Sequence, residues 1–167
     1  MEDDMKKALK HTTVAASVLL LGLLASAPAF ADAPIRQGGN FGLGIGGGTY
    51  NSGLSLKYYM SSGQALQGVV GFNYRRDWIG LNLDYLFEMP ALATGNVVEL
   101  GWNLGPGAAV GISDYGVGAA VAGVAGLEFN FNPVPIDLVL EWRPSLNIVP
   151  NVDLDLVGFT GHIRFYF

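Results

Sequence analysis

Alternation of apolar and polar side chains with a period of two runs through most of the chain after residue 39. In the segment 78–88, the odd positions from 79 to 87 are all apolar, whereas Gly80, Asn82, Asp84 and Glu88 occupy even positions. A helix cannot separate neighbouring residues onto two faces in this way, but a β-strand does so automatically. The pattern predicts an all-β chain and leaves little room for helices.

Eight segments share this pattern, and turn residues such as Asn51-Ser52-Gly53 and Ser61-Ser62-Gly63 separate them. Connections this short join antiparallel neighbours, so the sequence predicts an up-and-down antiparallel barrel. Gly105-Pro106-Gly107 interrupts the fifth segment and predicts a bulge or a local loss of pairing there. The predicted strands cover 40–50, 54–60, 65–74, 78–89, 96–112, 117–131, 136–148 and 154–167.

The N-terminal region has the pattern of a secretory signal peptide. An apolar stretch from Val14 to Leu24 follows three lysines, and Ala29 and Ala31 provide the small residues of a cleavage site before Asp32. We therefore divide the chain into a signal peptide (1–31), an N-terminal lead (32–39) and a barrel (40–167). An uncleaved anchor helix is the alternative, and translation could start at Met1 or at Met5.

The apolar face of such a barrel can point inward, as in a soluble protein, or outward to lipid. The strand 154–167 pairs an apolar face with a face that carries His162 and Arg164, which favours a polar interior. Aromatic residues also gather at the two expected rims, as in the girdles of membrane barrels. One rim holds Phe41, Tyr58, Tyr85, Phe87, Phe129, Phe131, Phe165 and Phe167, and the other Phe72, Tyr74, Trp142 and Phe159. We therefore expect an eight-stranded transmembrane β-barrel.

The end of the chain carries a further signal. Phe159, Ile163, Phe165 and the terminal Phe167 stand on one face of the last segment. This arrangement resembles the C-terminal assembly signal of bacterial outer-membrane barrels, and the chain as a whole resembles the small OmpX-like and OmpA-barrel-like class. The resemblance implies location in the outer membrane of a Gram-negative bacterium, with the export and barrel-assembly machinery as partners. It carries no functional residue to this chain.

Charged side chains are expected inside the barrel, where they must be paired. The short connection around Pro150 places Arg164 near Asp137 and Glu141, and we expect it to form a salt bridge with one of them. A packed polar interior is one interpretation of these charges, and a narrow ion path is the other. The predicted interior network comprises Lys57, Asp84, Glu88, Glu99, Glu128, Asp137, Glu141, Arg143, His162 and Arg164.

Several kinds of chemistry lack support. The chain has no cysteine and a formal net charge of −5, which argues against a thiolate metal site and against nucleic acid. Gly42, Gly44 and Gly47 match a dinucleotide-binding spacing, but no helix follows. We expect Gly42, Gly44 and Gly46 to face the interior and to make room for large side chains. His162 is expected to face inward near mid-height, and the nearest hydroxyl in its own strand is Thr160, so we expect no metal, no cofactor and no catalytic site.

The sequence thus predicts an outer-membrane barrel in contact with lipid and lipopolysaccharide. The turn at Arg75 and Arg76 could meet lipopolysaccharide phosphates or be an ordinary solvated turn. The expected role is structural, in the bacterial envelope. The alternatives are a narrow porin-like channel, a barrel that binds a small solute or lipid and, more weakly, a lipid-modifying enzyme.

Overall fold

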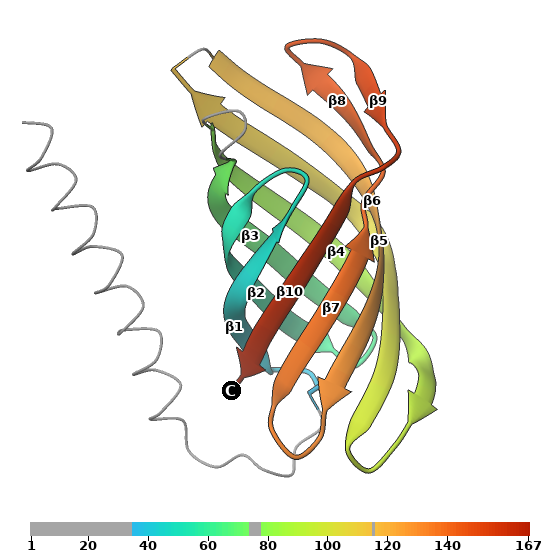
Figure 1. The fold of residues 1–167 in the computed structure, drawn as a ribbon. Helices are drawn as coiled ribbons and strands as arrows, with labels where there is room; N and C mark the ends of the chain where they lie inside the picture. The colour runs from blue at the N-terminus through green and yellow to red at the C-terminus, as the bar shows by residue number, and fades with distance from the viewer. Residues whose placement is uncertain (1–34, 74–77, 115) are drawn as a thin grey trace, which may run out of the picture. The chain divides into compact units, whose positions relative to one another are not determined.

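The computed structural model describes residues 35–73, 78–114 and 116–167, and within them it is all-β. Ten strands form one antiparallel sheet (Figure 1). They are β1 (Phe41–Gly48), β2 (Ser52–Ser61), β3 (Gln64–Asn73), β4 (Trp78–Thr94), β5 (Val98–Ser113), β6 (Gly116–Phe131), β7 (Ile136–Trp142), β8 (Ser145–Val149), β9 (Asp153–Asp155) and β10 (Phe159–Tyr166).

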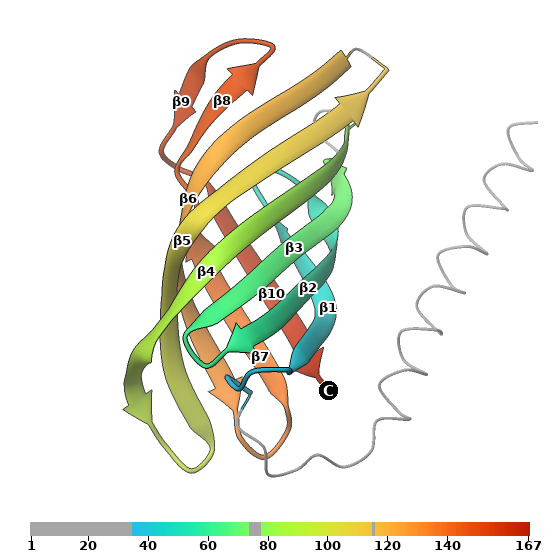
Figure 2. The same cartoon turned by 180° about the vertical axis from the view of Figure 1, so that it is seen from behind.

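The sheet closes on itself as an eight-stranded barrel. Neighbours in sequence pair from β1 to β7, and the last strand β10 pairs with both β7 and β1. The pair β7 and β8 acts as one strand, because both continue along β6 in the same register, with Trp142 opposite Ala125 and Ser145 opposite Ala122. Figure 2 shows the closure from behind, where β3, β4 and β5 run side by side. The eight-stranded antiparallel barrel predicted from the sequence is therefore confirmed.

Besides shifts of a few residues at other strand ends, three features differ from the predicted strands. The seventh and eighth predicted strands are each interrupted, the seventh at Pro144 and the eighth between Asp155 and Phe159. Proline has no N–H to donate to the ladder, which breaks β7 from β8. The predicted turn that begins at Pro90 is wrong, because β4 continues to Thr94 after a register shift between Met89 and Ala93.

The interruption predicted at Gly105-Pro106-Gly107 is confirmed on one side of the fifth strand. Pairing with β6 is continuous, with Pro106 opposite Gly123. Pairing with β4 passes from Asp84–Gly107 to Phe87–Leu104 and omits the residues between. β5 therefore continues as one strand, while its hydrogen-bond ladder with β4 is locally unpaired.

Burial alternates along the strands and places the charged residues inside. In β3, Ala65, Gln67 and Val69 are buried, whereas Leu66 and Val70 are exposed. The strand glycines of β1 make room for this interior, since a Cβ at Gly42 would lie 2.6 Å from the ring of Tyr166. No helix long and apolar enough to cross a membrane occurs among the residues that the structure describes.

Candidate functional site: the charged interior

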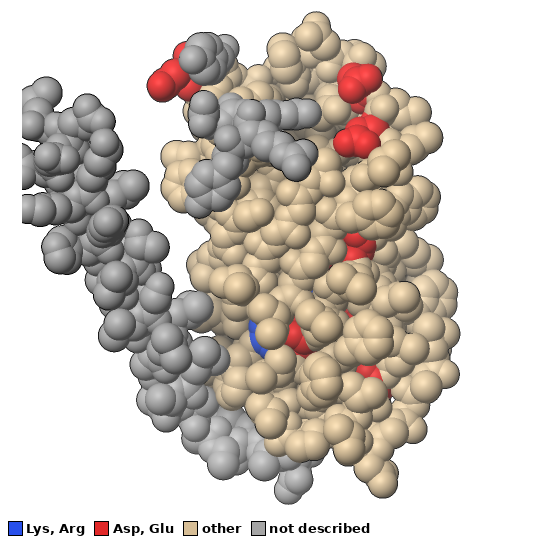
Figure 3. Space-filling view, viewed as in Figure 1, with Lys and Arg blue, Asp and Glu red and all other residues tan. Residues whose placement is uncertain are grey.

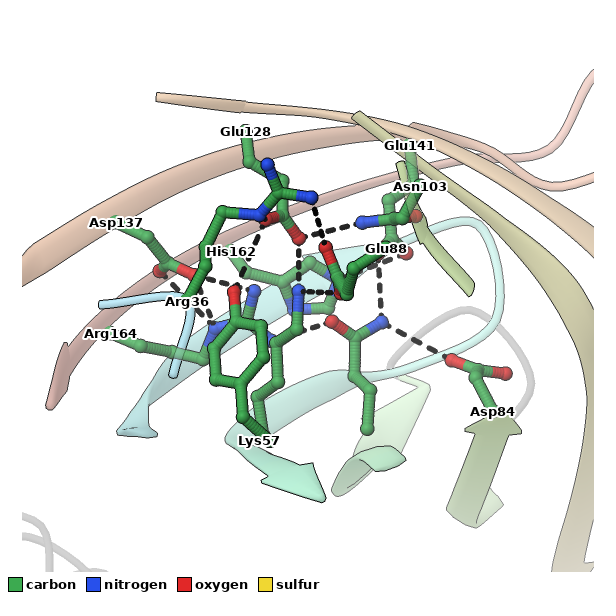
Figure 4. Close-up of polar contacts among 12 residues, drawn as sticks. Arg36, Lys57, Asp84, Glu88, Asn103, Glu128, Asp137, Glu141, His162 and Arg164 are labelled. Atoms are coloured by element: carbon green, nitrogen blue, oxygen red, sulfur yellow. Dashed lines mark hydrogen bonds and ion pairs between the residues drawn. The ribbon is translucent and has the colours of Figure 1, made fainter. Parts of the chain in front are cut away.

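The interior of the barrel holds two clusters of hydrogen-bonded charges, together with a small buried apolar cluster that includes Ile35, Leu86 and Val124. Figure 4 shows side chains from β2, β4, β6, β7 and β10 pointing toward one another across the lumen. Each of the five fully buried carboxylates contacts at least one basic side chain. The contacts are Asp84 with Arg143, Glu88 and Glu128 with Lys57, Asp137 with Arg164, and Glu141 with His162.

Lys57 of β2 lies between two glutamates from other strands. Its Nζ is 2.7 Å from Oε1 of Glu88 and also bonds to Oε1 of Glu128. Asn103 donates to the same Glu128 oxygen at 2.6 Å, and the hydroxyl of Tyr59 donates to the other oxygen at 3.2 Å. One ammonium thus balances two carboxylates, and neutral donors supply the remaining hydrogen bonds that buried carboxylates need.

Arg36 enters this cluster from the segment before β1. Its Nη2 donates to Oε2 of Glu88 at 3.2 Å and to the carbonyl of Met89 at 2.5 Å, and its Nη1 lies 3.5 Å from Glu99. Burial lowers the pKa of Arg36, but Glu88 and Glu128 outweigh it and hold that pKa above its ordinary value. The side chain of Arg36 is therefore part of the interior, which the sequence analysis did not predict.

Arg164 of β10 forms the salt bridge predicted for it. The registered neighbour Asp137 accepts from its Nε at 3.0 Å and from its Nη2 at 2.7 Å. Tyr166 donates to the same carboxylate at 2.7 Å, and Arg164 Nη1 donates to Oε1 of Gln67 at 2.5 Å. This carboxylate and guanidinium are therefore both held by several hydrogen bonds, the geometry in which a buried ion pair is most stable.

Gln67 of β3 connects the Arg164–Asp137 pair to Glu141 and to Asp84. Its amide oxygen accepts from Arg164, while its Nε2 donates to Glu141 at 2.7 Å and to Asp84 at 3.2 Å. Asp84 in turn accepts hydrogen bonds from both terminal nitrogens of Arg143, at 2.7 and 2.6 Å. A neutral amide can serve in this way because it donates and accepts at once.

His162 lies between a serine and a glutamate. Ser55 Oγ is 3.0 Å from Nδ1 of the imidazole, and Oε2 of Glu141 is 3.1 Å from Nε2. The sequence analysis considered only Thr160, in the same strand, and did not predict that Ser55 lies beside His162. Ser55 reaches it across β1 because Gly46, between them in the sheet, has no side chain, and a Cβ there would overlap the imidazole.

The serine, histidine and glutamate share the connectivity of a nucleophile, a base and an orienting acid. Ser55 nevertheless has no exposed surface, and Glu141 and His162 are 1% and 2% exposed. A nucleophile must reach its substrate, so in this structure the three residues act as a hydrogen-bonded part of the interior.

Other predicted residues lie where the alternation placed them. Phe159, Ile163 and Phe167 are exposed on the outside of β10, and Phe165 is half-buried there beside Phe167. Ala29 and Ala31, together with Tyr74, Arg75 and Arg76, lie outside the described residues. The sequence analysis missed Arg36, Ser55, Tyr59, Gln67, Asn103 and Tyr166 as members of the network.

Comparison of the chain with protein-family models, with curated proteins and with solved structures found no match. The function must therefore be argued from the fold and from this interior.

Proposed function

We propose that this chain is an integral outer-membrane β-barrel with a packed polar lumen and a structural role in the bacterial envelope. The observation that carries the proposal is the distribution of side chains between the two faces of the barrel. Charges and amides fill the inside, while large apolar residues such as Leu83 (56% exposed) and Leu140 (57% exposed) cover the outside. The face in Figure 3 accordingly shows few charged atoms.

Such an outer surface is costly in water and favourable in lipid. Soluble monomers rarely expose contiguous apolar patches larger than a few hundred Å². Here exposed leucine, valine and isoleucine side chains occur on every strand of the barrel wall, among them Ile45, Leu54, Val70, Leu81, Val110, Val121, Leu138 and Ile163. Aromatic residues at the rims, including Tyr58, Phe87 and Phe159, are also exposed and suit the interfaces of a bilayer.

Fractionation of cells that express the full chain tests the location. The proposal expects the protein in the outer-membrane fraction, resistant to extraction by urea, with the C-terminal signal recognised by the barrel-assembly machinery. Lipopolysaccharide is then its natural neighbour. Recovery of a folded barrel in a soluble fraction would contradict the proposal.

A charge on the outer face should be far less tolerated than a charge in a turn. We expect Leu83→Arg, near mid-height, to lower the free energy of unfolding by about 2–4 kcal/mol in phospholipid vesicles, because the guanidinium would face hydrocarbon. Ser62→Arg, in the β2–β3 turn, should be nearly neutral. Urea titration of both variants measures the difference, and equal tolerance would indicate that Leu83 does not face lipid.

The alternative of a narrow channel requires an open path, which the paired interior opposes. We expect no steady single-channel current from the protein in planar bilayers, because Arg164, Gln67, Arg143 and their carboxylates bridge the lumen. Gln67→Gly, which removes the connecting amide, serves as a comparison and should raise the frequency of brief openings. A steady current through the unaltered protein would favour the channel.

A further inference from the structure

The segment before β1 places one arginine in a mouth of the barrel. Figure 4 shows the guanidinium of Arg36 beside the carboxylates of Glu88 and Glu128. The side chain of Arg36 is only 10% exposed, and the preceding Ile35 belongs to the buried apolar cluster. Residues 37–39, which follow, are exposed. Of residues 35–39, therefore, only Ile35 and Arg36 enter the barrel.

The surroundings of Arg36 fit a flat guanidinium group. Its Nη2 donates both to a carboxylate oxygen of Glu88 and to the backbone carbonyl of Met89, while its Nη1 lies 3.5 Å from Glu99. Gly101 of β5 forms the floor, since a Cβ there would lie 3.0 Å from Nη1. A planar fork of donors reaches several acceptors at once, whereas an ammonium is a compact point charge. The site is therefore built for the shape of a guanidinium as well as for its charge.

The carboxylates around Arg36 do not depend on it alone. Lys57 binds Oε1 of Glu88 at 2.7 Å, and Arg36 binds the other oxygen, Oε2. Glu128 also keeps Lys57 as a partner, and the side chain of Glu99 is 24% exposed, so water can hydrate it. Loss of one partner from a buried ion pair is costly when the other charge is left alone. Arg36 can therefore leave the site without stranding a fully buried carboxylate.

A glycine turn connects Arg36 to β1. Gly39 has a φ of 97°, a left-handed backbone conformation that glycine adopts readily. Its N–H donates to the carbonyl of Tyr59 at 2.7 Å, which joins the chain to the barrel wall at this point. Ahead of Gly39, the contacts with the interior are those of the side chains of Ile35 and Arg36. Movement about this turn would therefore withdraw both side chains together.

We propose that this mouth is a binding site for guanidinium groups, which the chain fills with its own Arg36, and that residues 35–39 form a displaceable plug. When the plug is withdrawn, a small guanidinium compound or an arginine side chain of another peptide takes the place of Arg36. An ammonium binds more weakly, because it lacks the planar fork that meets Glu88, Met89 and Glu99 together. The proposal rests on contacts inside the barrel and not on its location in the outer membrane.

Chemical rescue of Arg36→Ala tests the binding site. The full chain is unfolded by urea in detergent micelles, with and without millimolar methylguanidinium. We expect the variant to fold with a lower urea midpoint than the unaltered protein, and methylguanidinium to raise that midpoint in a saturable way. Methylammonium and Mg²⁺, at matched ionic strength, should bind to the variant about tenfold or more weakly than methylguanidinium does. The unaltered protein, whose site is filled, should show no such rise.

The matched control is Gln37→Ala. Gln37 is the next residue of the plug and is exposed, so its loss should leave the urea midpoint unchanged and should create no response to methylguanidinium. Circular dichroism checks that each variant retains its barrel. A folded Arg36→Ala that methylguanidinium does not rescue would overturn the proposal. Equal rescue by methylammonium or Mg²⁺ would also overturn it, because the site would then be a general cluster of acids.

Trypsin tests displacement of the plug without changing Arg36, and it keeps the proposal testable if Arg36→Ala does not fold. The protease cleaves after arginine and lysine in extended, accessible chain, so it can cut between Arg36 and Gln37 only when the plug is withdrawn. We expect slow cleavage at this bond in the folded barrel, identified by the mass of the product that begins at Gln37. Cleavage after Lys57, inside β2, reports global unfolding and serves as the internal reference.

Two isosteric variants complete the protease experiment. Glu88→Gln should accelerate cleavage after Arg36 about tenfold relative to cleavage after Lys57, because it weakens the contact with the guanidinium. Glu141→Gln makes the same change at a buried carboxylate that contacts His162, and should leave that ratio unchanged. If the bond after Arg36 is never cut before the bond after Lys57, the plug does not open separately from unfolding, and the proposal fails.

Discussion

Replacing Arg164 by methionine should lower the free energy of unfolding by about 3–5 kcal/mol, because it leaves a buried carboxylate without its cation. Asp137 is fully buried and accepts three hydrogen bonds from the guanidinium. Among the residues that the structure describes, Tyr166 then remains as its only side-chain donor, and Gln67 loses the donor to its amide oxygen. Urea unfolding in phospholipid vesicles measures the change.

A double-mutant cycle separates the ion pair from the general effects of substitution. The double variant Arg164→Met with Asp137→Leu should lose less free energy of unfolding than the two single variants lose in sum. The reason is that no uncompensated charge remains in it. Ile163→Met is the matched control, since Ile163 is the preceding residue of β10 and faces outward. Additive losses in the cycle would contradict the coupling that the geometry predicts.

Replacing Lys57 by methionine should destabilise the barrel by a similar amount, about 3–5 kcal/mol. Lys57 balances Glu88 of β4 and Glu128 of β6, neither of which is a strand that pairs with β2. Arg36 cannot fully replace it, because its Nε lies 3.9 Å from Glu128. The same unfolding assay, with circular dichroism as a check of strand content, measures the loss.

Ser55→Ala provides the control for Lys57→Met. Ser55 faces the lumen from the same strand and is equally buried, but it contributes one neutral hydrogen bond to His162. Ser55→Ala should therefore lower the free energy of unfolding by about 0.5–1.5 kcal/mol. Adding Glu128→Gln to Lys57→Met should recover part of the stability, because it removes one unpaired carboxylate. If Lys57→Met costs no more than Ser55→Ala, the two-glutamate cluster does not stabilise the barrel.

The register of the last hairpin shows how far local reasoning extends. A short connection restricts which residues of two adjacent strands face each other, so Arg164 could be assigned to Asp137 or Glu141 before the structure was known. Period-two alternation likewise assigned Lys57, Asp84, Glu128 and Arg143 to the interior. Of the two proline interruptions, the one at position 106 was predicted and the one at position 144 was not. Pro144 breaks a strand, whereas Pro106 only weakens one ladder.

Contacts across the lumen depended on the closed barrel. Strand tilt and stagger decide which side chains meet from opposite walls, and neither quantity is visible in the alternation. For this reason the sequence analysis did not predict that Ser55 meets His162, that Gln67 connects Arg164 to Glu141, or that Arg36 enters from the lead segment. A cavity lined by Asn51, Asn82 and Asn147 likewise depends on closure of the barrel, because these asparagines come from separate strands and turns.

The sequence by itself determined that this chain forms eight antiparallel strands, and which residues line the inside, because alternation and short turns are local properties. Only the tertiary structure decided which charges pair, which glycines receive a neighbouring ring, and where the interior remains open. Those features follow from the distance between walls that are far apart in the chain. Closure of the barrel sets that distance, and no local pattern encodes it.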